Sequence, residues 1–128
     1  MKHDMRVLVT GGRGYGDVLG AFKVLDTLHS AWRITCVVHG AAHGADAIAA
    51  DWANDRGVPT DPYPITADEW ASYGRRAGPR RNARMLQTQP DLVIAFPGGR
   101  GTADCIKQAR KLGIGVYEIS GKVANASA

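Results

Sequence analysis

Five short apolar runs alternate with segments of helical periodicity along this chain, and this alternation constrains the fold more than any other feature. The runs lie at residues 5–10, 34–40, 58–65, 91–96 and 114–119. The runs at 5–10, 34–40 and 91–96 are rich in Val and Ile, which is typical of strands buried on both faces of a parallel sheet. The run at 58–65 is interrupted by prolines, so we expect that strand at an edge of the sheet.

Helical spacing of apolar residues separates these runs and predicts helices over residues 17–32, 44–55 and 101–113. Two shorter helices are expected between the third and fourth strands. Thr66 and Glu69 fit a capping box that opens the first of these, and Pro79 suits the first turn of the second. The whole pattern predicts an α/β, Rossmann-like fold. Its doubly wound parallel sheet would have about five strands in the order 3-2-1-4-5, with helices on both faces.

The composition is that of one ordinary globular domain, because 45% of the 128 residues are hydrophobic and 22% are charged. We expect residues 1–120 to form a single domain and residues 121–128 to form a flexible tail. The chain starts without the apolar core of a signal peptide, and no apolar run approaches the ~20 residues of a membrane span. These features predict a cytoplasmic protein.

The basic charge of the chain is concentrated in one place, since five arginines and no acid lie within residues 75–84. Removing those five from the 16 basic residues leaves 11, against 12 acidic residues, which is a net charge of −1. A duplex-binding surface usually spreads its Lys and Arg along a face. A compact cluster suits a compact anion, such as a phosphate group, equally well.

Three glycine-rich segments, at residues 10–16, 39–46 and 96–102, follow the first, second and fourth predicted strands. In the predicted order the sheet reverses between the first and fourth strands, and ligands of such sheets bind at the carboxyl ends of the strands near that point. Glycines let the backbone approach a ligand closely, and helix N-termini favour anions. The segments therefore predict an anion-binding crevice, although tight turns alone would explain the glycines of any single loop.

Two common nucleotide motifs are excluded. The first segment does not satisfy G-x-G-x-x-G, and no acid ends the second strand to hold a ribose. Nothing in the chain matches the Walker pattern G-x-x-x-x-G-K-[ST]. His39 and His43 are four residues apart, but a histidine that ends a strand shares no helical face with the other, so we expect no metal site and no cofactor.

The motifs together resemble the YspA-like branch of the SLOG superfamily. The matching segments are G-x-R at 11–13, H-G-x-x-x-G-A-D at 39–46, W-x-x-Y-G-x-x-A-G-P-x-R-N-x-x-M at 70–85 and PGG-x-GT at 97–102. That superfamily includes the lonely-guy phosphoribohydrolases and DNA-processing proteins of the DprA type. The resemblance covers residues 5–119 and implies a Rossmann-like domain that recognises nucleotides or nucleotide-derived ligands. Because SLOG relatives often pair, it also implies a possible homodimer.

The candidate ligand-binding residues lie within these motifs. They are Gly11, Gly12, Arg13, His39, Gly40, His43, Gly44, Asp46, Arg81, Asn82, Pro97, Gly98, Gly99, Gly101 and Thr102. We expect Arg81 to grip a phosphate in a bidentate manner and the glycines before Thr102 to cradle it. Thr102 is also an expected helix N-cap. Asp46 is either a first-turn acid or an acceptor for a ribose hydroxyl. Trp70 and Tyr73 either pack in the core or a lid, or stack on a base.

Three functions follow, in order of preference. The first is binding or sensing of a nucleotide-derived ligand, such as a nucleoside phosphate or an ADP-ribose-like molecule. The second is hydrolysis of the N-glycosidic bond of a nucleoside 5′-monophosphate, for which the resemblance to phosphoribohydrolases implies Arg81 and Asp104 as the catalytic pair. The third is DNA binding, which the net charge of +4 favours.

Overall fold

Five parallel strands form one sheet in the order β3-β2-β1-β4-β5, which confirms the predicted topology. The computed structural model describes residues 3–120, and the tail predicted at 121–128 lies outside them. The strands are β1 (Asp4–Thr10), β2 (Arg33–His39), β3 (Thr60–Pro62), β4 (Leu92–Ala95) and β5 (Gly115–Glu118). The strand with the prolines, β3, has only three residues and lies at an edge, as its sequence predicts.

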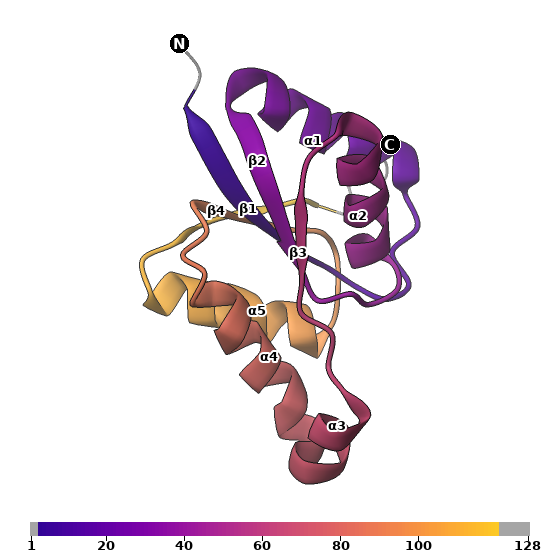
Figure 1. Cartoon of the computed structure of the whole chain (residues 1–128), viewed down its shortest axis with the longest axis vertical. Coiled ribbons are helices and arrows are strands. Elements are labelled where there is room, and N and C mark those ends of the chain that lie inside the picture. The colour runs from indigo at the N-terminus through magenta and orange to yellow at the C-terminus, as the bar shows by residue number, and fades with distance from the viewer. Residues whose placement is uncertain (1–2, 121–128) are drawn as a thin grey trace.

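Helices cover both faces of this sheet. They are α1 (Val18–Ala31), α2 (Ala45–Arg56), α3 (Ala67–Tyr73), the 3₁₀ turn η1 (Gly74–Arg76), α4 (Ala77–Leu86) and α5 (Arg100–Lys111). Figure 1 shows α1 and α2 on one side of the sheet and α4 and α5 on the other. Within residues 3–120, no helix has the length and apolar character needed to cross a membrane.

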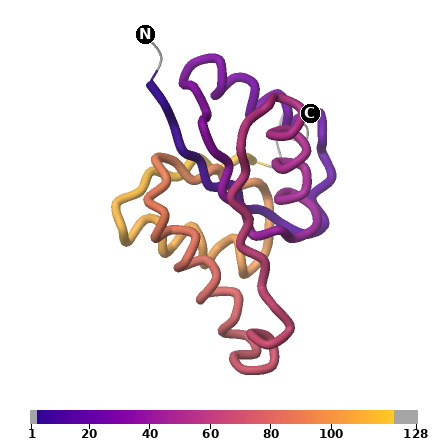
Figure 2. The backbone as a smooth tube through the Cα atoms, in the orientation of Figure 1, coloured from indigo at the N-terminus to yellow at the C-terminus, as the bar shows by residue number. Residues whose placement is uncertain are grey.

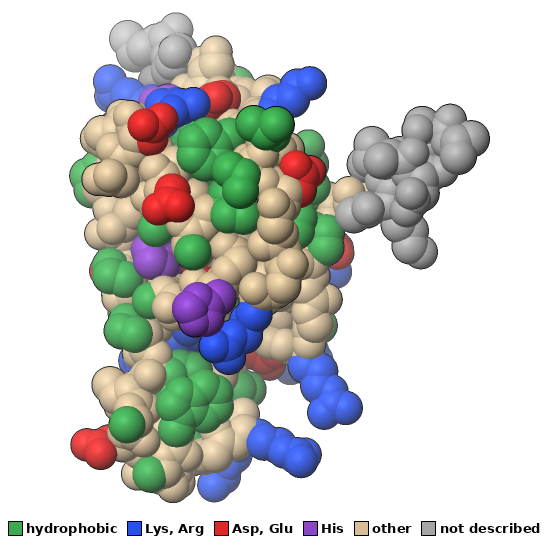
Figure 3. All heavy atoms as spheres, turned by 90° about the vertical axis from the view of Figure 1, so that its right-hand side faces the viewer, with side chains coloured by type: hydrophobic (Ala, Val, Ile, Leu, Met, Phe, Trp, Pro, Cys, Tyr) green, Lys and Arg blue, Asp and Glu red, His purple; other side chains and the backbone are tan. Residues whose placement is uncertain are grey.

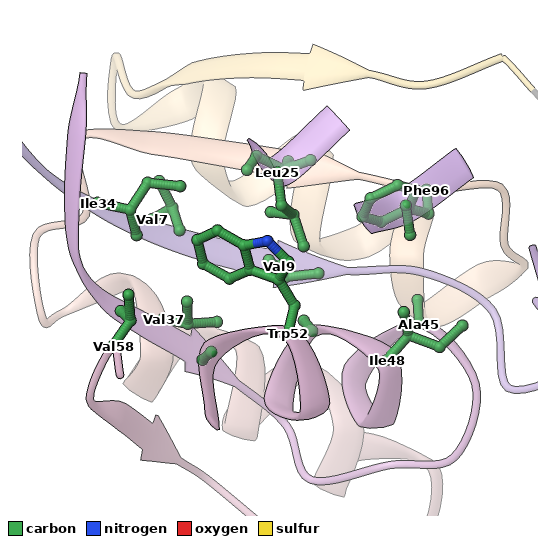
Figure 4. Packing of buried hydrophobic residues seen from close by; sticks show 14 residues of the cluster. Val7, Val9, Leu25, Ile34, Val37, Ala45, Ile48, Trp52, Val58 and Phe96 are labelled. Atoms are coloured by element: carbon green, nitrogen blue, oxygen red, sulfur yellow. The ribbon is translucent and has the colours of Figure 1, made fainter. Parts of the chain in front are cut away.

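Two hydrophobic clusters, one on each face, hold the layers together. Val7 and Val9 of β1 pack with α1 and α2, whereas Leu8 packs with α4 and α5. This alternation follows from the two-residue period of a strand. Trp52 of α2 lies in the middle of the larger cluster (Figure 4), is fully buried, and donates its indole N–H to the Asp26 carboxylate at 2.9 Å.

One segment projects from the body of the molecule. After β3 the chain runs away from the sheet, forms α3 and η1, and returns along α4 (Figures 1 and 2). We call residues 67–80 the arm. Its first helix starts with the predicted capping box, because Thr66 and Glu69 exchange two hydrogen bonds of 3.1 Å. Neither α3 nor η1 contains a buried residue, so α4 is what anchors the arm to the body.

Candidate functional site

The three glycine-rich loops meet at the carboxyl edge of the sheet, as the strand order predicts. The Gly12 N–H of the β1–α1 loop donates to the Pro97 carbonyl of the β4–α5 loop at 2.8 Å. The Gly12 carbonyl accepts from the Ala45 N–H, at the start of α2, at 3.2 Å. Backbone hydrogen bonds therefore join the loop after β1 to the loops after β4 and β2.

The approach of these loops depends on glycine. Gly44 has a φ of 76°, and a Cβ at this position would lie 2.6 Å from the Arg13 carbonyl oxygen. A Cβ at Gly12 would lie 2.9 Å from the Pro97 carbonyl oxygen. Contacts this short do not occur with real side chains, so the glycines set how closely the loops can pack.

A cavity of about 550 Å³ opens between these loops and the arm, and we call it the first cavity. Three arginines line it, namely Arg13, Arg81 and Arg100, together with the single acid Asp46. Pro64, Ile65 and Trp70 add apolar surface on the arm side. Figure 3 shows Lys and Arg side chains near the junction between the body and the arm.

Arg81 reaches from α4 to the loops that follow β2 and β3. Its Nη1 donates to the Gly40 carbonyl at 2.7 Å and to the Tyr63 carbonyl at 3.3 Å. Burial lowers the pKa of the Arg81 guanidinium, and the nearby Asp46 carboxylate opposes that shift. Arg81 therefore ties the arm to the sheet and also presents a positive charge at the cavity.

Asp46, in the first turn of α2, binds the backbone of the loop that follows β2. Its Oδ2 accepts hydrogen bonds from the backbone N–H groups of Gly40 at 3.0 Å and Ala42 at 3.3 Å. The side chain is almost fully buried in the first turn of α2. Burial raises the pKa of this carboxyl to about 6, although both hydrogen bonds and the Arg81 charge favour the ionised form. The Gly40 peptide is thus held by Asp46 at its N–H and by Arg81 at its carbonyl.

Asp46 gives a pH-dependent prediction for stability. The pKa of its carboxyl is about 6 in the folded protein, against 3.8 for an ordinary aspartate, so the folded state binds this proton more tightly. The associated stability is present below pH 4 and is lost as the pH rises toward 6. Asp46→Asn keeps an acceptor oxygen without the charge and should remove this loss.

We expect the free energy of unfolding of Asp46→Asn to improve relative to wild type by about 2 kcal/mol between pH 4 and pH 7. Urea denaturation at several pH values measures the difference. A difference between the two proteins that stays constant over this range would show that Asp46 does not carry the raised pKa.

Asn82 of α4 and Asp104 of α5 are joined by a hydrogen bond. The Asn82 amide donates to the Gly101 carbonyl at 3.1 Å and to Asp104 Oδ2 at 3.0 Å. Gln108 donates to the same carboxylate oxygen at 2.7 Å. Asn82 lines the cavity, whereas Asp104 does not. The structure therefore brings Arg81 and Asn82 to the cavity and places Asp104 in a hydrogen-bonded link between α4 and α5.

The predicted phosphate cradle forms the start of α5, but Thr102 is not the N-cap. The helix begins at Arg100 with Gly99 as its N-cap, which leaves Thr102 as a buried residue of the first turn. The N-cap therefore lies three residues earlier than the threonine predicted. Gly99, Gly101 and Thr102 all line the cavity. The first N–H groups of a helix lack partners within it, so this turn offers donors to an anion.

Other predicted site residues lie around the cavity without lining it. They are His39, His43, Gly44, Pro97 and Gly98. His39 is buried, its Nδ1 accepts from the Ala41 N–H at 3.0 Å, and burial lowers the pKa of its imidazole. Among residues 3–120, no three His, Cys, Asp or Glu side chains gather in a way that would hold a metal ion.

Sequence reasoning missed several lining residues, among them Arg100, Pro64 and Ile65. Arg100 is the variable position of PGG-x-GT, and its only signal is its place between two glycines of that motif. The sequence leaves Trp70 open between the core and a stacking role, and the structure places it in the cavity wall with half of its surface exposed. Its position on the arm explains both properties.

The five clustered arginines have different partners. Arg81 points to the cavity, Arg84 pairs with Glu69 at 2.8 Å, and the Arg80 guanidinium lies 3.8 Å from the centre of the Tyr73 ring. Arg75 and Arg76 are exposed in η1. Of the five, only Arg81 therefore lines the cavity.

Comparison with known proteins gives three findings. The model of the family described as YspA, cpYpsA-related SLOG (YAcAr) matches residues 5–73, more than half of the chain. The Gene 61 protein of Mycobacterium phage D29 is 38% identical over 124 residues, covering 91% of this chain and 98% of that protein. The X-ray structure of DNA processing protein A (DprA) from Streptococcus pneumoniae is similar with a TM-score of 0.73 at 20% identity. That similarity covers 94% of this chain but only 52% of the DprA chain, so the chain spans about half of DprA's length.

Proposed function

Because the chain belongs to the YspA, cpYpsA-related SLOG family, we propose that it binds a nucleotide-derived small molecule in the first cavity. One observation carries this proposal. The same cavity is lined by three arginines and the first turn of α5, and by the apolar side chains of Pro64, Ile65 and Trp70. The first set suits a phosphate and the second suits a base.

The phosphate belongs at the start of α5. Gly99, Gly101 and Thr102 place the first turn of that helix at the cavity, where its free N–H groups and its dipole favour an anion. Arg100 and Arg13 are exposed and line the same space, so they add charge without losing an existing partner among the described residues. Arg81 contributes charge from the buried side.

The base belongs near Trp70. An indole with half of its surface exposed beside Ile65 offers a flat apolar surface, on which aromatic rings stack favourably. Asp46, at the end of the glycine-rich segment 39–46, also lines the first cavity, and its carboxylate suits a sugar hydroxyl. The position of Asp104 supports binding rather than hydrolysis, because its carboxylate accepts from Asn82 and Gln108 and does not line the cavity.

Isothermal titration calorimetry tests this proposal. The common nucleoside mono- and diphosphates are titrated into the protein, with inorganic phosphate and the free nucleosides as controls. We expect saturable binding of at least one nucleotide at one site per chain, tighter than that of its nucleoside or of phosphate. If no nucleotide gives a saturable signal, the proposal is wrong.

A further inference from the structure

A second cavity, more open to solvent than the first, lies beside the β1–α1 loop. It has a volume of about 620 Å³ and is lined by residues 12–17 of that loop and residues 97–99 of the β4–α5 loop. The first cavity has about 550 Å³. Both volumes fall within the range of about 300–1,000 Å³ that is usual for small-molecule sites. The binding of a mononucleotide in the first cavity leaves the second without an occupant.

The two cavities share part of their walls. Gly12, Arg13 and Gly99 line both of them. The hydrogen bond of 2.8 Å from the Gly12 N–H to the Pro97 carbonyl joins the two loops at this point. A ligand group bound beside Gly99 and Arg13 would therefore have one cavity on each side. Crevices at the reversal of a doubly wound sheet accommodate two-part ligands in this way.

The shared wall and the second cavity differ in chemistry. Arg13 is exposed, and it has no hydrogen-bond or ion-pair partner among residues 3–120, so its guanidinium is available to phosphate oxygens. The second cavity instead includes Tyr15, half-buried against Phe96, and the acid Asp17, whose Oδ1 caps α1 by accepting from the Gly20 N–H at 3.0 Å. A carboxylate and a phenol accept hydrogen bonds from hydroxyl groups, whereas an acid repels a further phosphate.

We propose that the ligand is a nucleoside diphosphate that carries a second, hydroxyl-rich group, such as a sugar, on its terminal phosphate. The nucleoside occupies the first cavity, the two phosphates lie along Gly99 and Arg13, and the second group occupies the second cavity. This inference rests on the proposed function and specifies its ligand class.

Two glycines allow each cavity to be filled separately. Gly16 lines the second cavity and Gly78 lines the first. A Cβ at either position meets nothing within 4 Å, and neither glycine has a positive φ. Gly16→Leu and Gly78→Leu should therefore fold, and the second variant costs some stability because its Cβ precedes Pro79 within α4. Melting temperatures confirm that both are intact.

The test measures binding of three ligand series by calorimetry: AMP, ADP and ADP-ribose; GMP, GDP and GDP-mannose; UMP, UDP and UDP-glucose. In the series with the preferred base, we expect the sugar-bearing diphosphate to bind wild type at least about tenfold more tightly than the plain diphosphate. Gly16→Leu should abolish this preference and leave the affinity for the monophosphate unchanged. Gly78→Leu should weaken the binding of all members of the series.

Several outcomes would overturn the inference. Equal affinities of plain and sugar-bearing diphosphates for wild type would do so while leaving the proposed function intact. The inference would also be wrong, with the proposed function intact, if Gly16→Leu keeps the preference for the sugar-bearing diphosphate. It would be wrong as well if this variant weakens binding of the monophosphate as much as binding of the sugar-bearing ligand. Failure of all nine ligands to bind would remove the proposed function and this inference together.

Discussion

An Arg81→Ala variant should lose about ten- to a hundredfold in affinity for the nucleotide that binds wild type most tightly. Arg81 is the clustered arginine that lines the first cavity, and a charge-assisted hydrogen bond in a partly buried site contributes about 1.5–3 kcal/mol. The Gly40 and Tyr63 carbonyls also lose their donor, so the loops around Asp46 should loosen. Calorimetry below the melting temperature of the variant measures the loss.

Arg80→Ala and Arg75→Ala are the matched controls. Arg80 lies over the Tyr73 ring and Arg75 is exposed in η1, so neither should change the affinity by more than about twofold. Arg81→Lys keeps the charge but not the planar fork of donors. Its affinity for the nucleotide should therefore lie between those of wild type and Arg81→Ala. Equal losses at positions 75, 80 and 81 would indicate a spread nucleic-acid surface instead of a clamp for a small anion.

A Gly44→Ala variant should lose about 3 kcal/mol or more of folding stability. The φ of 76° and ψ of −126° at Gly44 form a conformation that residues with a Cβ rarely adopt. The added methyl group would also meet the backbone of Gly12 and Arg13, which cannot move without opening the site. We expect thermal unfolding to show a decrease in melting temperature of roughly 10 °C.

Gly57→Ala separates the two causes of this effect. Gly57 also has a positive φ, 69°, at the end of α2, but a Cβ there meets nothing within 4 Å. Gly57→Ala should lower the folding stability by only about 1 kcal/mol, which is the usual penalty of the left-handed conformation. If Gly44→Ala is no more destabilising than Gly57→Ala, the close contact between the loops after β1 and β2 is not what the glycine permits.

The sheet order and the meeting of the glycine loops could be predicted because they depend on local patterns. Continuous Val- and Ile-rich runs fix the buried strands, and the prolines near Thr60 confine β3 to an edge. The capping box at Thr66 involves residues only three apart. Once the strand order is known, the carboxyl ends of β1, β2 and β4 must lie at one edge of the sheet.

The partners of the site side chains could not be predicted in the same way. Arg81 bonds to Gly40, 41 residues earlier in the chain, and Asn82 bonds to Asp104, 22 residues later. Such pairs depend on how α4 packs against the loops, which no local pattern encodes. The error at Thr102 has a different source, because a threonine before a helical run is a common N-cap, but here the glycines extend α5 to Arg100.

The arginine cluster illustrates the same limit. Its charge predicted an anion site nearby, but the sequence alone did not distinguish Arg81 from its neighbours except through the family motif. The structure separates them by geometry, since a helix directs successive side chains about 100° apart. Arg84 pairs with Glu69 on the arm, whereas Arg81 reaches the Gly40 carbonyl.

The most direct test of the central claim is an NMR titration of backbone amides with the nucleotide that binds most tightly. If a phosphate binds at the start of α5, the amide signals of Gly99, Arg100, Gly101 and Thr102 should shift together and saturate at one equivalent. The signals of Arg75 and Arg76 should stay in place, because these exposed residues of η1 do not line the first cavity. Saturable shifts confined to the arm, with no change at residues 99–102, would contradict the account.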